Sequence, residues 1–150
     1  MKVFIASDHG GYELKNTLVK NLSENGYDTT DLGPENFDPE DDFPDITQTL
    51  CASVTSSLGS CGILLCRNGI GVSIAANKFK KIRCALSFNV KHAESAKTDD
   101  NANVLALPTD YITKSDALNI VLAFLTTPFS NDERFIRRIL KVEAFENGTH

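Results

Sequence analysis

An alternation of short apolar runs with amphipathic stretches constrains the fold of this chain more than any other feature. The apolar runs have the length of buried strands. Between them, apolar residues recur at helical spacing, as at Leu14, Leu18 and Leu22. Strands that alternate with helices in this way are joined in parallel by helical crossovers. The pattern predicts an α/β fold.

The same pattern gives approximate bounds for each element. The expected strands are 3–6, 27–32, 61–65, 82–86 and 103–107. The expected helices are 14–22 (ended by a cap at Gly26), 45–58 (begun by a cap at Asp45), 72–79, 90–97, 114–126 and 132–146. Residues 33–45 hold three prolines and six acids and are expected to form a loop.

Size, charge and hydropathy limit the classes of protein to consider. One domain over residues 1–150 is expected, because that length is typical of a single core. The net charge of −5 argues against general nucleic-acid binding, which needs a positive surface. No apolar stretch approaches the roughly 18 residues of a membrane span, and no signal peptide is recognisable. We therefore expect a cytoplasmic protein with neither nucleic acid nor membrane as a partner.

The four cysteines, at 51, 61, 66 and 84, are not spaced as metal-binding pairs. With only three histidines in the chain, no metal site is expected. Reduced thiols are the simplest interpretation for all of them except Cys66, which lies in a more informative setting.

Three loops are expected to meet at one edge of the sheet. They are residues 7–11, residues 66–71 and the region that leads to Asp42 and Phe43. In open parallel sheets, ligands bind beyond the carboxyl ends of the strands. These loops are therefore the candidate site.

Cys66 ends an apolar run and is followed directly by a loop with two glycines and the expected start of a helix. The spacing does not fit a Walker loop, a dinucleotide fingerprint or a cysteine phosphatase loop. Amides at such a turn can bind an anion, and the positive end of a helix favours a thiolate. A base beside anion-binding amides suits proton abstraction next to a carbonyl. A buried structural thiol is the open alternative.

The last expected helix carries a cationic stripe. Arg134, Arg137, Arg138 and Lys141 follow helical spacing, while Phe135, Ile139 and Val142 are expected to face inward. The stripe would repel itself unless something anionic meets it. A solvated face or a partner's acids could explain it, and a phosphate held by two arginines is the sharper alternative.

Several segments, in order along the chain, resemble the type-B ribose-5-phosphate isomerase family, which also contains the galactose-6-phosphate isomerase subunits. They are SDHGGYELK (7–15), DFP (42–44), GILLCRNGIGVSIAANKFKKIRCAL (62–86), NANVL (101–105) and ERFIRR (133–138). The likeness covers nearly the whole chain, and its central segment is highly specific.

This resemblance implies a Rossmann-like three-layer α/β/α sandwich with a five-stranded parallel sheet. It also implies a homodimer or tetramer with sites between subunits, and a small phosphorylated sugar as substrate. The implied reaction needs no metal or cofactor: aldose and ketose phosphates interconvert through an enediolate.

The resemblance also implies a role for each matched residue. Cys66 matches the proton-abstracting cysteine, and Asp8 and His9 match a substrate-binding pair. Arg134 and Arg138 match the arginines that hold phosphate, together with His9. The backbone that matches the enediolate cradle runs through Arg67, Asn68, Gly69, Ile70 and Gly71.

Four places depart from the family pattern. The usual Cys-Gly-Thr-Gly reads Cys66-Arg67-Asn68-Gly69, and a usual tyrosine is Phe43. The ring-opening histidine and the asparagine after it are replaced by Asp99 and Asp100, and a substrate arginine by Asp110.

Three functions are compatible with these residues. The first is isomerisation of ribose 5-phosphate and ribulose 5-phosphate. The second is isomerisation of another sugar phosphate, either an open-chain tetrose phosphate or a hexose 6-phosphate. The third is a catalytically weak relative that binds sugar phosphates. Because an aspartate is normally ionised at neutral pH and cannot donate a proton, Asp99 predicts weak activity on the ring-closed ribose phosphate.

Overall fold

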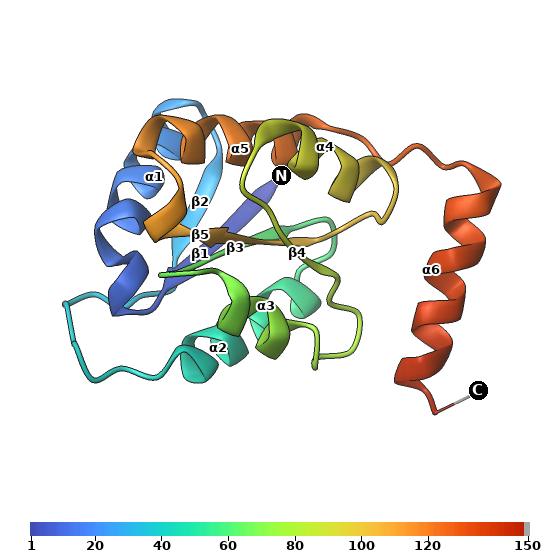
Figure 1. Ribbon diagram of the computed structural model, residues 1–150, viewed down its shortest axis with the longest axis horizontal. Coiled ribbons are helices and arrows are strands. Elements are labelled where there is room, and N and C mark those ends of the chain that lie inside the picture. Colours follow the sequence, from blue (N-terminus) through green and yellow to red (C-terminus); the bar gives the residue numbers. More distant parts are fainter. Residues whose placement is uncertain (149–150) are drawn as a thin grey trace.

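A parallel sheet organises residues 1–148, the part of the chain that the structure, a computed structural model, describes. Its five strands are β1 (Lys2–Ser7), β2 (Asp28–Asp31), β3 (Cys61–Cys66), β4 (Cys84–Leu86) and β5 (Val104–Pro108). They lie in the order β2-β1-β3-β5-β4, and every neighbouring pair is parallel (Figure 1). The predicted α/β fold with a five-stranded parallel sheet is confirmed.

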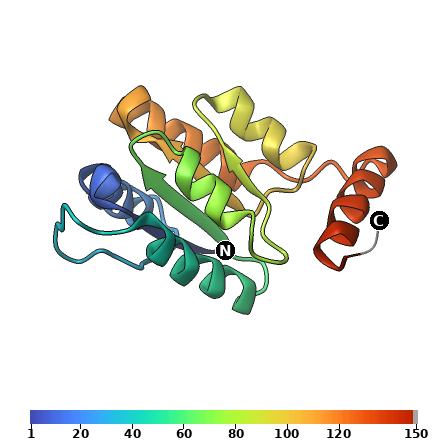
Figure 2. The same cartoon turned by 60° about the horizontal axis from the view of Figure 1, so that its bottom comes forward.

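Helices cover both faces of this sheet, which makes a Rossmann-like three-layer sandwich (Figures 1 and 2). The helices are α1 (Tyr12–Glu24), α2 (Phe43–Ser56), α3 (Ile70–Ala76), α4 (Val90–Thr98), α5 (Lys114–Thr126) and α6 (Glu133–Glu146). Helices α1, α4 and α5 pack on one face, while α2 and α3 pack on the other. Helix α6 stands apart from both layers.

The packing of the core explains why the three central strands, β1, β3 and β5, are nearly continuous runs of apolar residues. Successive residues of β3 point to opposite faces of the sheet, and both faces are covered by helices. Ile63 packs with Leu18 and Phe124 in one fully buried cluster. Leu64 packs with Leu50 in the other. Each such side chain stabilises the fold by about 1.5–3 kcal/mol.

Helices α2 and α3 differ from the predicted bounds for local reasons. Helix α2 follows Asp42 rather than Asp45, because Pro44 is accommodated in its first turn. Helix α3 runs over Ile70–Ala76 instead of 72–79. It ends at Asn77, whose side-chain amide donates to the carbonyl oxygens of Ser73 and Cys84 and closes the turn toward β4.

Helix α6 buries less of its apolar face than predicted. Phe135 is buried, Ile139 is partly buried and Val142 is 49% exposed. Ile139 and Val142 line a groove between α6 and the rest of the chain, so they face inward as predicted but are incompletely covered. Among the helices of residues 1–148, none has the length and apolar character needed to cross a membrane.

Candidate active site

Cys66 lies at the carboxyl end of β3, the central strand of the sheet. All six residues of β3 are buried, and Cys66 itself is only 5% exposed. Its sulfur accepts a hydrogen bond from the backbone N–H of Gly69 at 3.1 Å. The loop that follows the strand thus contacts the sulfur directly.

A tight turn brings that amide back to the sulfur. Gly69 has a left-handed backbone (φ 69°), and a Cβ there would lie 3.1 Å from backbone atoms of Leu107 and Pro108. This conformation favours glycine. Asn68 Oδ1 accepts the N–H of Ile70 at 2.9 Å and lies 3.8 Å from the sulfur of Cys66. Two amides of the predicted cradle are thus already used within the loop.

The loop after β1 lies directly against this turn. A Cβ on Gly10 would lie 2.5 Å from Arg67 Cγ, so glycine is what lets the two loops touch. Asp8 is buried, and its Oδ1 accepts the N–H of Gly11 at 3.2 Å. Burial raises the pKa of Asp8.

The third loop completes the predicted convergence. Phe43, the first residue of α2, packs over Gly71, where a Cβ would lie 3.0 Å from its ring. Asp41 contacts His9 twice: its Oδ1 accepts the backbone N–H of His9 at 3.0 Å and lies 2.7 Å from the ring nitrogen Nδ1. The three loops predicted to share this edge of the sheet therefore meet.

The segment after β5 adds two contacts to this edge. Thr109 donates its hydroxyl toward the carbonyl oxygens of Gly10 (2.9 Å) and Cys66 (3.2 Å), and so joins two of the loops. Arg67 lies 3.7 Å from the carboxylate of Asp110 in an exposed ion pair. Two of the residues that depart from the family pattern thus face each other at the mouth of the site.

The arginines of α6 lie at the other edge of the sheet. Helix α6 is anchored where β4 and β5 begin, while Cys66 lies where β3 ends (Figure 1). A strand of five residues such as β5 spans roughly 16 Å. Arg134 and Arg138, both exposed, are therefore not brought to Cys66 within one chain.

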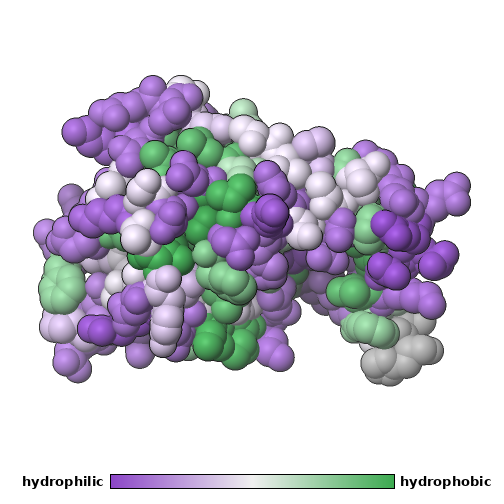
Figure 3. All heavy atoms as spheres, turned by 45° about the horizontal axis from the view of Figure 1, so that its top comes forward, coloured by the Kyte–Doolittle hydropathy of each residue, from purple (hydrophilic) through white to green (hydrophobic). Residues whose placement is uncertain are grey.

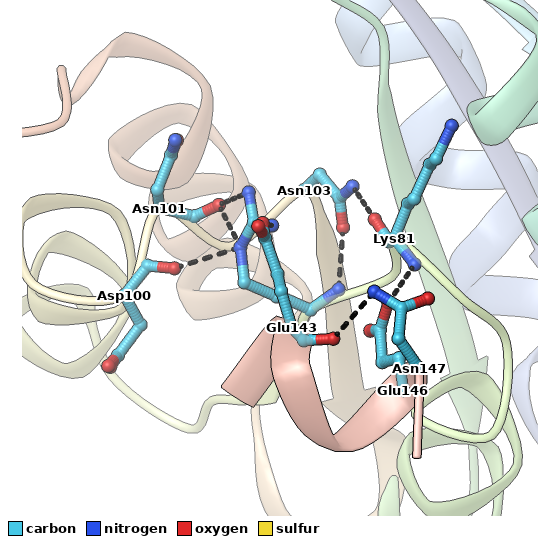
Figure 4. A network of polar contacts seen from close by, with 8 residues as sticks. Lys81, Asp100, Asn101, Asn103, Glu143, Glu146 and Asn147 are labelled. Carbon is cyan, nitrogen blue, oxygen red and sulfur yellow. Dashed lines mark hydrogen bonds and ion pairs between the residues drawn. The ribbon is translucent and has the colours of Figure 1, made fainter. Parts of the chain in front are cut away.

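A polar network fixes α6 in this place, as Figure 4 shows. The guanidinium of Arg83 donates to the carbonyl oxygens of Asp100 and Asn101 and lies 3.4 Å from Glu143 of α6. The backbone N–H of Lys81 donates to Glu146 at 3.0 Å. These contacts join α6 to the turns before β4 and β5 and leave its apolar side chains largely uncovered.

A groove of about 960 Å³ separates α6 from the body of the chain. Figure 3 shows this hollow, with apolar residues of α6 beside it. Arg138 lines the groove together with Asp99 and Asp100. Asp99 thus shares a groove with Arg138, and the residues lining this groove do not include Cys66.

Two contributors to the site were not foreseen from the sequence, namely Asp41 and Thr109. Asp41 is one of six acids in the loop 33–45, and nothing in its spacing marks it out. Thr109 follows β5 directly, so its place at the carboxyl edge of the sheet was the available signal.

Comparisons with known proteins agree with this architecture. A model of the family described as Ribose/Galactose Isomerase matches residues 3–142. The chain is 38% identical over 150 residues to ribose-5-phosphate isomerase B of Mycobacterium leprae, covering 100% of this chain and 92% of the relative. It is 40% identical over 144 residues to a probable ribose-5-phosphate isomerase B of Mycoplasma pneumoniae, covering 96% and 94%.

A solved structure is similar over nearly the whole chain. Ribose-5-phosphate isomerase B from Mycoplasma genitalium, crystallised with bound ribulose-5-phosphate, matches with a TM-score of 0.94 and 40% identity. The match covers 99% of this chain and 97% of that one.

Proposed function

The chain belongs to the ribose/galactose isomerase family, and we propose that it interconverts ribose 5-phosphate and ribulose 5-phosphate through an enediolate. Its close relatives are ribose-5-phosphate isomerases B, so the protein is an aldose–ketose isomerase. The observation that carries the proposed mechanism is Cys66, nearly buried where the loops converge, with a backbone N–H donated to its sulfur.

Cys66 is the base in this mechanism. In the open-chain aldose, the thiolate takes the proton from carbon 2, and the electrons of that C–H bond form a double bond between carbons 1 and 2. Negative charge moves to the oxygen on carbon 1, where amides of the 67–71 turn not used within the loop stabilise it. Return of the proton to carbon 1, with a proton shift between the two oxygens, gives the ketose.

His9, Arg134 and Arg138 hold the phosphate, and Asp8 binds the sugar beside His9. His9 lies at the carboxyl edge of the sheet with Cys66, whereas the two arginines lie at the amino edge. One chain alone therefore supplies only part of this set. We infer that the arginines of a second copy meet the loops of the first, which gives a homodimer or tetramer with sites between subunits.

Exposed apolar residues of α6 support such an assembly. Ile136 and Leu140, one turn apart on the helix, are 38% and 58% exposed, although apolar side chains on an amphipathic helix are normally buried. Asp99 and Arg138 line the same groove, so both residues of one copy would contact the site of a second copy together.

A second candidate substrate is favoured by one observation, the aspartate at position 99. An ionised aspartate cannot protonate a ring oxygen, and a tetrose 4-phosphate has no furanose ring to open because the required hydroxyl is esterified. On this account an open-chain tetrose phosphate would be turned over relatively well, and ring opening would limit the ribose reaction.

Turnover assays on a panel of four-, five- and six-carbon sugar phosphates test this proposal. Interconversion of ribose 5-phosphate and ribulose 5-phosphate supports the first function, and a preference for the tetrose supports the second. Binding without turnover of any member of the panel would contradict both and leave a sugar-phosphate-binding protein.

A further inference from the structure

Asp41 touches His9 in a way that has consequences for the site. A single carboxylate oxygen, Oδ1, lies 3.0 Å from the backbone nitrogen of His9 and 2.7 Å from ring nitrogen Nδ1. Two donors of one residue therefore converge on one acceptor. The contact to the backbone nitrogen holds the main chain of His9 in place, and the contact to Nδ1 sets the orientation of its imidazole ring.

This arrangement also selects the tautomer of the ring. A carboxylate can only accept hydrogen bonds, so Nδ1 of His9 carries the proton that faces Asp41. The other ring nitrogen, Nε2, then points away from Asp41 and is left for a ligand. The Asp41 side chain is only 14% exposed, whereas that of His9 is 29% exposed, so the pair has a buried side and an open side.

The charges around His9 act in opposite directions. The hydrogen bond to Asp41 raises the pKa of His9 most, partial burial lowers it, and the charges of Asp8 and Asp41 raise it further. Arg67, which lies over the neighbouring Gly10, lowers it. The net result is a raised pKa, so His9 keeps its positive charge to a higher pH than an isolated histidine.

We propose that Asp41 is a positioning residue of the active site, which orients the His9 imidazole and holds it in the charged form for the substrate's phosphate. This inference rests on the proposed function of His9 in phosphate binding. A carboxylate close to a phosphate site repels the ligand unless a cation lies between them. In this proposal the charged imidazole of His9 is the cation that separates Asp41 from the phosphate.

The direction of the pH effect follows from the raised pKa. Phosphate affinity that depends on protonated His9 is present below the pKa of His9 and is lost as the pH rises through it. Removing the charge of Asp41 lowers that pKa, so the loss moves to lower pH. Above both pKa values, each unit of lowering leaves about tenfold less charged His9.

NMR titration of the His9 ring tests the pairing without requiring turnover. We would compare the wild-type chain with Asp41→Asn, which keeps an acceptor oxygen and removes the charge, and with Asp41→Ala. Glu40→Gln is the matched control, because it removes one negative charge from the next, exposed position of the same loop. The affinity for inorganic phosphate would be followed in the same samples across pH.

We expect a lower His9 pKa in both Asp41 variants and little change in Glu40→Gln. Phosphate affinity should fall at pH above the new His9 pKa and recover below it. An unchanged His9 pKa in Asp41→Asn would overturn the pairing. A lowered pKa with unchanged phosphate affinity would overturn the role of Asp41 in ligand binding. Failure of the isomerase proposal would appear separately, as wild-type protein that binds phosphate but does not turn over sugar phosphates.

Discussion

The loops at the carboxyl edge of the sheet and the helix α6 differ in how much of their own surroundings the chain provides. The loops are packed against one another: Gly10 lies under Arg67, Gly71 under Phe43, and the sulfur of Cys66 beside the amide of Gly69. Helix α6 is tied down by polar contacts, and much of its apolar face remains exposed. On the proposed function, Cys66 and His9 are therefore positioned within one chain, whereas Arg134 and Arg138 would have to come from another copy.

The largest expected effect comes from the loops. Cys66→Ala should lower kcat by at least the roughly 10²-fold that a general base supplies, because no other group takes the proton from carbon 2. Phosphate affinity should be nearly unchanged. Steady-state kinetics with ribose 5-phosphate measure kcat, and a phosphate titration measures the phosphate affinity.

Cys51→Ala is the matched control for that variant. Burial raises the pKa of Cys51 to about 11, so this thiol stays protonated at neutral pH and has no part in the reaction. Its truncation should lower the free energy of unfolding and leave kcat unchanged. A near-normal kcat for Cys66→Ala would contradict the role of Cys66 as the base.

The next largest effect comes from α6. Arg134→Ala or Arg138→Ala should raise KM by about ten- to a hundredfold, since each removes a charge-assisted contact of about 1.5–3 kcal/mol. Arg137→Ala is the control, because it lies on the same exposed stripe outside the positions matched to phosphate binding. Equal losses in all three variants would indicate a general electrostatic field instead of a specific pair.

A several-fold effect is expected at position 99, which shares the groove with Arg138. Histidine can pass a proton near neutral pH where an aspartate cannot. Asp99→His should therefore raise kcat for ribose 5-phosphate more than for a tetrose 4-phosphate, measured side by side. If the wild-type protein turns over the pentose at ordinary isomerase rates and the tetrose not at all, ring opening is not limiting.

The smallest effect concerns how α6 is held. The contact of Glu143 with Arg83 is partly exposed, so Glu143→Gln should cost at most about 1 kcal/mol of stability. Glu24→Gln, which removes the more exposed pair with Lys20 on α1, is the control and should cost less. Thermal unfolding at low and high salt measures both. A larger loss for Glu24→Gln would contradict the anchoring role of Arg83.

Sequence patterns predict the arrangement of the loops more fully than they predict the surroundings of α6. The carboxyl ends of parallel strands share an edge, so placing Cys66 and Asp8 at strand ends was enough to bring their loops together. The contact of Asp41 with His9 could not be predicted from the sequence, because the path of an irregular loop is set by tertiary packing. Helical periodicity identified the cationic stripe of α6 and its inward side, but it could not tell how far that side is covered, and Val142 stays 49% exposed.

Mixing two inactive variants tests whether each site joins the loops of one copy to the arginines of another. Cys66→Ala and the double variant Arg134→Ala/Arg138→Ala would be unfolded, mixed in equal amounts and refolded together. In a mixed dimer, one site receives both substitutions and the other receives neither. Random pairing then predicts about a quarter of the wild-type kcat/KM. Activity no higher than the mean of the two separately refolded variants would contradict the shared site.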